Sequence, residues 1–102
     1  MEHKIWNPKW ECATREEKNQ IQLERLKKIT AYCYERVPFY KKKFDEIGLK
    51  PDHIKTLKDV RLLPFTTASD LKDNYPFGLF AVPKDEIVRI HGSSGTTGKP
   101  KI

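Results

Sequence analysis

Apolar residues recur three or four positions apart between residues 23 and 37, so that they fall on one face of a helix. These positions are Leu23, Leu26, Ile29, Cys33 and Val37. Upstream of this stripe, Thr14 and Glu17 have the spacing of a capping box, in which each side chain accepts from the other residue's backbone N–H. The pattern therefore predicts a helix from residue 14 to residue 36.

Proline and glycine divide the next part of the chain into shorter elements. Pro38 ends the first helix and suits the first turn of a second one, which Gly48 closes as a C-terminal cap. We expect a brief helix from Thr56 through Leu62, ended by Pro64. These signals predict helices of decreasing length after residue 38.

A second capping pair, Thr67 and Asp70, predicts a helix through about Asn74. The apolar run 77–83 follows Pro76, contains a glycine and ends in a proline, so we expect a packed loop there. Residues 86–91 then alternate β-branched and polar side chains, which predicts a strand. A lone strand cannot satisfy its backbone groups, and residues 101–102 offer the only partner, which would make a hairpin.

Composition excludes several classes of protein. The chain is 37% hydrophobic and 33% charged, and no apolar run approaches the roughly 20 residues that span a membrane. The first residues lack the apolar core of a signal peptide, and Cys12 and Cys33 form no CxxC pair, so we expect a reducing, cytoplasmic setting. His3, His53 and His91 lie far apart in the sequence, and we expect no metal site.

The net charge of +6 raises the alternative of a small basic helical module that binds a nucleic acid or a protein. The basic residues of the first predicted helix alternate with Glu16, Glu17, Glu24 and Glu35. The one basic triplet, residues 41–43, is followed at once by Asp45 and Glu46. This mixed pattern is typical of a solvated helix face, so we expect no nucleic-acid partner.

Residues 93–101 have the composition of a loop that binds phosphate groups. Gly95 and Gly98 leave room for phosphate oxygens near the backbone and permit the positive φ angles of an anion-binding nest. Hydroxyl donors come from Ser93, Ser94, Thr96 and Thr97. Lys99 and Lys101 add positive charge. The loop is no Walker A motif, since Ser93 stands where that motif has glycine and Pro100 follows Lys99.

These observations predict an α+β fold class, mostly helical, with a terminal strand or hairpin. Residues 1–85 form the helical segment in this interpretation. Residues 86–102 form a strand and the phosphate-binding loop, at the start of a truncated core. Because the chain stops two residues after the loop, we expect it to be an N-terminal fragment.

The string from Ser93 to Lys101 resembles the phosphate loop of the adenylate-forming enzyme superfamily. Within that superfamily, the upstream sequence resembles the phenylacetate–coenzyme A ligase branch. The stretches that carry this likeness are residues 5–8, 37–40, 63–67, 70–83 and 88–91. Gly92 and Lys101 depart from the branch, which shows alanine and more often threonine there, although lysine at 101 is frequent in the wider superfamily.

The resemblance implies that the chain is part of the large N-terminal domain of an AMP-forming acid–thiol ligase. Such an enzyme converts an aryl acid, Mg-ATP and coenzyme A into acyl-AMP and then the acyl-CoA thioester. It implies that the β- and γ-phosphates are held by Ser93, Ser94, Gly95, Thr96, Thr97 and Gly98, with Lys99 as a flanking cation. It places no catalytic residue within the chain.

Phenylacetate is the acid that the resemblance favours, and indoleacetate or a benzoate-type acid stays open as an alternative. The remaining part of the same enzyme chain is the expected partner of these residues, and family members are expected to be homodimers. We expect the isolated chain to be inactive, and to self-associate because it lacks the rest of the enzyme that would cover its apolar surface. No membrane association is expected.

Overall fold

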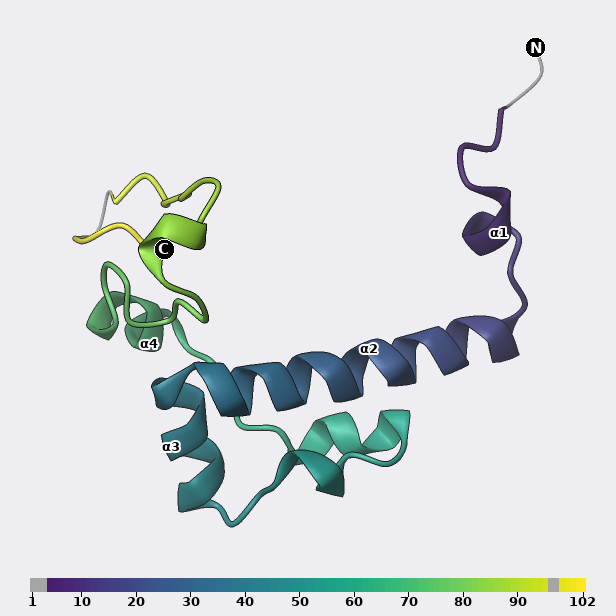
Figure 1. Cartoon of the computed structure of the whole chain (residues 1–102), viewed down its shortest axis with the longest axis horizontal. Coiled ribbons are helices and arrows are strands. Elements are labelled where there is room, and N and C mark those ends of the chain that lie inside the picture. Colours follow the sequence, from purple (N-terminus) through teal and green to yellow (C-terminus); the bar gives the residue numbers. More distant parts are fainter. Residues whose placement is uncertain (1–3, 96–97) are drawn as a thin grey trace.

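The molecule is organised along helix α2 (Arg15–Arg36), which runs across it in Figure 1. The computed structural model describes residues 4–95 and 98–102. The N–H of Glu17 donates to Thr14 Oγ1 at 3.1 Å, and the Glu17 carboxylate accepts from the N–H of Thr14 at 3.5 Å. The predicted helix and its capping box are therefore confirmed. A short helix that the pattern did not predict, α1 (Pro8–Glu11), precedes it.

The core lies where helix α3 (Pro38–Glu46) turns back against α2. The buried apolar residues are Val37, Phe44, Leu49 and Ile54. The Phe44 ring lies 5.7 Å from the ring of Tyr34 on α2, and Gly48, with φ of 69°, follows the end of α3. The second helix and its glycine cap are thus confirmed, and the two helices share a small core.

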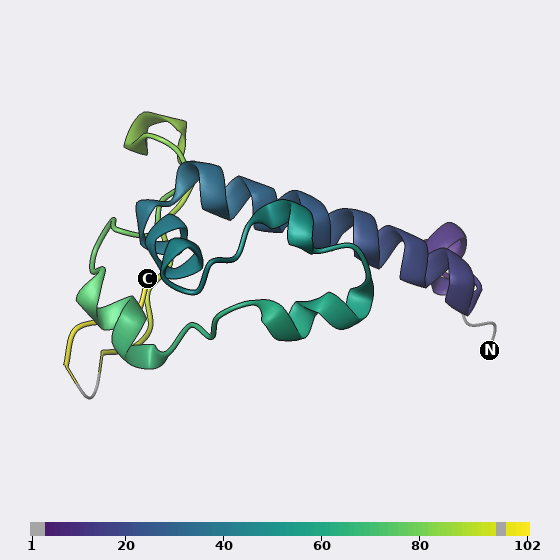
Figure 2. The same cartoon turned by 90° about the horizontal axis from the view of Figure 1, so that it is seen from below.

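Two 3-10 helices, η1 (Pro51–His53) and η2 (Leu57–Leu62), return alongside α2 (Figure 2). The predicted element after Thr56 is therefore present, as a 3-10 helix. Its start is fixed by Asp59, whose carboxylate accepts from the backbone N–H groups of Lys55 and Thr56, each at 2.9 Å. These bonds lower the pKa of Asp59, the N–H of Lys55 having the largest effect.

Helix α4 (Ala68–Asp73) follows in the chain and lies next to α3. It confirms the second predicted capping pair, Thr67 and Asp70. The N–H of Asp70 donates to Thr67 Oγ1 at 3.2 Å, and the Asp70 carboxylate accepts from the N–H of Thr67 at 2.8 Å. The carbonyl of Asp70 accepts from both the N–H of Asn74, at 3.2 Å, and the Asn74 side-chain amide, at 2.7 Å, so Asn74 closes the end of the helix.

The predicted strand at 86–91 is wrong. Glu86, the first residue of the predicted strand, belongs instead to the 3-10 helix η3 (Lys84–Glu86). No strand occurs within residues 4–95 or 98–102. Val88 is 95% exposed and Ile90 49%, so these two apolar side chains of the segment lack the cover that a neighbouring strand would give. The physical reason is the missing partner: the alternating pattern suits a strand, but described residues offer no second strand to complete the ladder.

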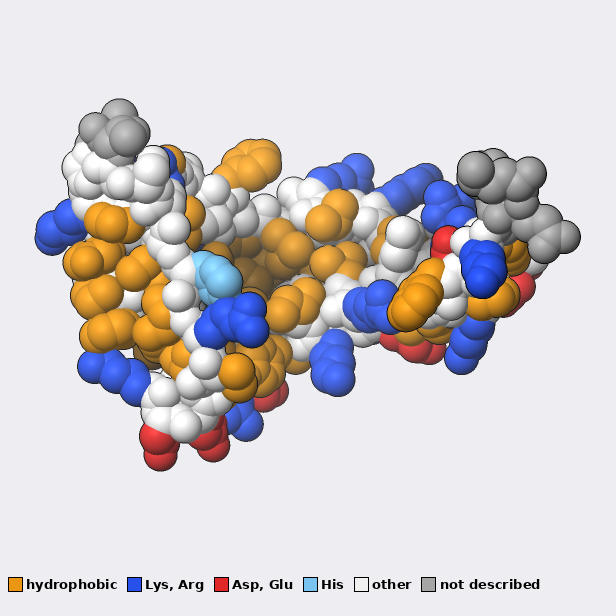
Figure 3. All heavy atoms as spheres, turned by 90° about the horizontal axis from the view of Figure 1, so that it is seen from above, with side chains coloured by type: hydrophobic (Ala, Val, Ile, Leu, Met, Phe, Trp, Pro, Cys, Tyr) orange, Lys and Arg blue, Asp and Glu red, His pale blue; other side chains and the backbone are white. Residues whose placement is uncertain are grey.

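The shape is open for a chain of this length. Its radius of gyration is 17.3 Å, against the roughly 13 Å expected of a compact domain of about 100 residues. Apolar side chains gather on one face, at the end of the molecule that carries α4 and the C-terminal residues (Figure 3). Among the described helices, none is long and apolar enough to cross a membrane. Much apolar surface thus lies outside the small core.

A candidate phosphate-binding loop

The candidate loop is closed at its base by two hydrogen bonds between its ends. The backbone N–H of Ser93 donates to the carbonyl of Lys101 at 3.0 Å, and the N–H of Lys101 donates to Ser93 Oγ at 2.8 Å. The predicted terminal hairpin is nevertheless wrong, because the described residues contain no strands on either side of this closure. The two ends of the candidate loop are consequently held together at Ser93 and Lys101.

Gly95 occupies a backbone position that requires glycine. Its φ is 70°, in the left-handed region that residues with a side chain rarely adopt. A Cβ atom there would lie 3.1 Å from the carbonyl oxygen of Gly98 and 3.3 Å from Cγ of Pro100. The N–H of Gly98 donates to the carbonyl of Gly95 at 3.3 Å, so a hydrogen bond joins these two glycines directly.

Gly98 and Gly92 differ from Gly95 in what a side chain would meet. Gly98 has φ of 130°, but no atom lies within 4 Å of a Cβ placed on it, so only its conformation favours glycine. A Cβ on Gly92 would lie 3.4 Å from Cβ of Pro100, an ordinary contact. The alanine that the resembling branch has at position 92 would therefore fit this fold.

The hydroxyl groups of the loop are only partly described. Ser93 and Ser94 are exposed, and the Ser93 oxygen accepts from the Lys101 N–H while its hydroxyl hydrogen stays available to donate. Thr96 and Thr97, which the sequence also assigns to the phosphate site, lie outside the described residues. The structure thus brings together the described site residues, from Ser93 to Gly95 and from Gly98 to Lys99.

The positive charge of the loop has an aromatic neighbour. The Lys99 ammonium lies 5.6 Å from the centre of the Tyr75 ring, and the loop lies beside α4 in both views of the ribbon (Figures 1 and 2). Within the described residues, the carboxylate ion pairs involve Lys41, Lys43 and Lys50, and neither lysine of the loop. Lys99 therefore keeps a charge that is available to an anion.

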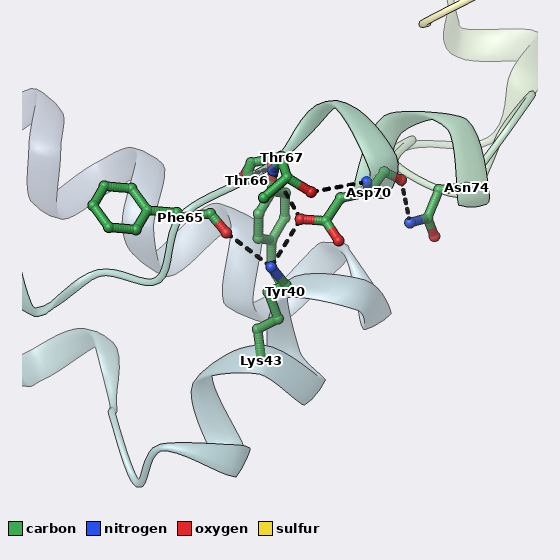
Figure 4. A network of polar contacts seen from close by, with 7 residues as sticks. All are labelled: Tyr40, Lys43, Phe65, Thr66, Thr67, Asp70 and Asn74. Carbon is green, nitrogen blue, oxygen red and sulfur yellow. Dashed lines mark hydrogen bonds and ion pairs between the residues drawn. The ribbon is translucent and has the colours of Figure 1, made fainter. Parts of the chain in front are cut away.

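Helix α4, beside the loop, is fixed to α3 by a polar network (Figure 4). The Lys43 ammonium donates to the Asp70 carboxylate at 2.9 Å and to the carbonyl of Phe65 at 2.8 Å. The hydroxyl groups of Tyr40 and Thr66 lie 2.9 Å apart. The N–H of Thr67 and the Lys43 ammonium hold the pKa of Asp70 below its usual range.

Sequence reasoning identified the loop but missed this support. Neither the Tyr75–Lys99 contact nor the Lys43–Asp70 pair follows from spacing, because each joins segments far apart in the chain. Within the described part, no group of three or more His, Cys, Asp or Glu side chains could hold a metal ion. The arrangement can therefore offer glycine backbone, hydroxyl donors and an ammonium group to a phosphate chain.

Known proteins resemble the chain closely. No protein-family model matches it. It is 51% identical over 98 residues to a phenylacetate–coenzyme A ligase of Thermus thermophilus, and 52% identical over 92 residues to one of Aromatoleum evansii. Over nearly its whole length, the chain is similar to phenylacetate–coenzyme A ligases. These matches cover 96% and 90% of the chain but 22% and 21% of the relatives, so it spans about a fifth of the length of these ligases.

A solved structure places the fold within a coenzyme A ligase. The chain matches 2-hydroxyisobutyryl-CoA ligase, in complex with 2-HIB-AMP and CoA in the thioesterification state, with a TM-score of 0.83 and 36% identity. The match covers 94% of this chain and 21% of that ligase. The mostly helical arrangement of α2, α3 and α4 thus also occurs as a part of 2-hydroxyisobutyryl-CoA ligase.

Proposed function

We propose that this chain contributes the phosphate-binding loop of an AMP-forming ligase that joins phenylacetate, or a similar aryl acid, to coenzyme A. The observation that carries the proposal is the loop itself. It is closed at its base by Ser93 and Lys101, has a hydrogen bond between Gly98 and Gly95, and bears the Lys99 ammonium without a described carboxylate partner. The names of the relatives support the acid and the thiol.

In the proposed reaction the carboxylate of the acid attacks the α-phosphorus of Mg-ATP. The bond between the α-phosphorus and the bridging oxygen breaks, and pyrophosphate leaves with that electron pair. The thiolate of coenzyme A then attacks the acyl carbon and displaces AMP, leaving the thioester. Magnesium enters as part of the ATP substrate in this proposal.

The chain's own residues act on the leaving group. The backbone around Gly95 and Gly98, with the hydroxyl groups from Ser93 to Thr97, would hold the β- and γ-phosphates. Lys99 would stand at the flank of the pyrophosphate, where charge increases as the bond breaks. Groups that are held in place before the reaction would orient the leaving group at little cost in reorganisation. None of them acts as a nucleophile or general base.

The remainder of the enzyme would supply the acid pocket, the coenzyme A site and the cover for the apolar surface. A hollow of about 190 Å³ lies between α2 and the segment before α4. It is lined by Ile29, Thr30, Cys33, Tyr40, Phe44, Leu63 and Pro64. Together with the open shape of the chain, this apolar hollow supports a role as one part of a larger domain. We expect the whole enzyme to be a homodimer.

The test is product formation by the full-length enzyme with ATP, magnesium, coenzyme A and a panel of acids. We expect phenylacetyl-CoA and AMP in equal amounts, with lower kcat/KM for indoleacetate, benzoate and 2-hydroxyisobutyrate. If the enzyme prefers another acid, the proposed substrate is wrong but the proposed reaction stands. Hydrolysis of ATP to ADP, or no AMP with any acid, would contradict the proposed reaction itself.

A further inference from the structure

The Tyr75 side chain is the aromatic group that the structure places against the loop lysine. The distance from Lys99 Nζ to the ring centre is 5.6 Å, within the range of about 6 Å over which the face of an aromatic ring attracts an ammonium group. Tyr75 is 39% exposed and Lys99 is exposed, so the ammonium remains open to solvent and to a ligand.

An aromatic ring and a carboxylate differ in how they affect the positive charge of a neighbouring lysine. Lys43 is paired with Asp70, and Lys41 with Asp45, each at 2.9 Å, so these ammonium charges are largely cancelled. The ring of Tyr75 orients Lys99 through its quadrupole and carries no net charge. The full positive charge is therefore kept at the loop, where an anionic phosphate chain requires it.

The position of Tyr75 is set by the turn that follows α4. Its N–H donates to the carbonyl of Lys72 at 3.2 Å, and the N–H of Gly78 donates to the carbonyl of Asn74 at 2.8 Å. A Cβ on Gly78 would lie 2.8 Å from that same carbonyl oxygen, so glycine allows the turn to close. Through Asp70 and Lys43 the turn is connected to α3.

We propose that Tyr75 is a positioning residue of the phosphate site, whose ring holds the Lys99 ammonium at the flank of the loop without neutralising it. This inference rests on the proposed function. Tyr75 touches no phosphate in this account and acts only through Lys99. Its contribution is to the binding of ATP, since the ring orients the lysine before the nucleotide arrives.

Four single variants of the full-length enzyme and one double variant test the proposal. Tyr75→Leu removes the ring and keeps apolar bulk, whereas Tyr75→Phe keeps the ring. Phe77→Leu is the matched control on the same segment, because the Phe77 ring contacts Lys84 at 3.8 Å and not the loop lysine. Lys99→Met removes the charge, and the double variant with Tyr75→Leu completes a mutant cycle. The measurement is the steady-state KM for ATP beside kcat and the KM values for acid and coenzyme A.

We expect Tyr75→Leu to raise the KM for ATP about two- to five-fold, with the other constants unchanged. Tyr75→Phe and Phe77→Leu should match the parent, and in the Lys99→Met background Tyr75→Leu should have no further effect. An unchanged KM in Tyr75→Leu would overturn the proposal. So would an equal rise in the Lys99→Met background, which would reveal a merely structural role.

A second measurement needs no variant at Tyr75. In the parent enzyme carrying ¹³C-dimethylated lysines, the Lys99 signal, assigned with Lys99→Arg, should be shifted upfield by the ring current. A signal at the position of an ordinary exposed lysine would contradict the contact. If the parent makes no acyl-CoA but shows this shift, the proposed reaction is contradicted and the contact between Tyr75 and Lys99 stands. If the parent is active but the shift is absent, the contact is contradicted and the proposed reaction stands.

Discussion

The Lys43 ammonium lies 2.9 Å from the Asp70 carboxylate and joins α3 to α4 at a half-buried position, with side chains 24% and 20% exposed. The same carboxylate caps α4 through the N–H of Thr67 at 2.8 Å. Asp70 thus both caps α4 and joins α4 to α3. Because the loop lies beside the turn that follows α4, the order of the candidate site depends on this pair.

Replacement of Asp70 by Asn should destabilise the α4 region. The variant loses the charge that pairs with Lys43 and weakens the cap, so the free energy of unfolding should fall. Urea denaturation of the full-length enzyme, followed by tryptophan fluorescence, measures it. Asp73→Asn is the control, since Asp73 is exposed on the same helix. Equal effects of the two substitutions would contradict the role of the pair.

The contribution of Asp70 should depend on pH in a defined direction. The Thr67 N–H and the Lys43 ammonium lower its pKa in the folded state, relative to about 3.9 in the unfolded chain. Its stabilisation is therefore fully present above pH 4 and is lost as pH falls through the lower, folded pKa. The difference in unfolding free energy between parent and Asp70→Asn should be constant from pH 7 to pH 5 and shrink at more acid pH. A difference that grew on acidification would have the wrong sign.

Gly78→Ala should disturb the turn that carries Tyr75. The added Cβ would lie 2.8 Å from both the carbonyl oxygen and the side-chain oxygen of Asn74, closer than real contacts allow. The expected cost is about 1–3 kcal/mol of stability, as for other overpacked positions, together with a raised KM for ATP. Gly92→Ala serves as the comparison, because a Cβ there meets only ordinary contacts. Thermal melting and ATP titration of both variants measure the effects, and equal tolerance of both would show that the turn can relax.

The isolated chain should self-associate through its apolar surface. Phe65 is 89% exposed, and Ile29, Val88 and Ile90 are about half exposed or more. Apolar surface of this kind favours association in water. Sedimentation velocity at rising concentration should show a growing larger species, reduced by Phe65→Lys. A single monomeric species at all concentrations would contradict this prediction.

How far the sequence predicts the structure depends on the range of the interactions. The helices at 14–36 and 38–46 and the caps at Thr14 and Thr67 were predictable because their signals lie within one or two turns. The strand at 86–91 was predicted wrongly because a strand depends on a neighbour, which a local pattern does not report. The alternating residues remain in the chain, but Val88 lies uncovered.

In the candidate site, too, local features could be predicted from the sequence and contacts between distant segments could not. The loop was recognisable from its glycines, hydroxyl groups and lysines, since these residue types are contiguous. The structure adds the positive φ of Gly95 and the closure between Ser93 and Lys101. The contact between Tyr75 and Lys99 joins residues on separate segments, and nothing in the local sequence around either one indicates it.

The most direct test is pyrophosphate release by the full-length enzyme with ATP, magnesium and phenylacetate, in the parent, Gly95→Val and Gly92→Ala. Valine at position 95 meets both a positive φ and the Gly98 carbonyl, so we expect kcat/KM for ATP to fall at least about tenfold. The parent and Gly92→Ala should release pyrophosphate at similar rates. Full activity in Gly95→Val, or no acid-dependent release in the parent, would contradict the assignment of residues 93–99 to the ATP phosphates.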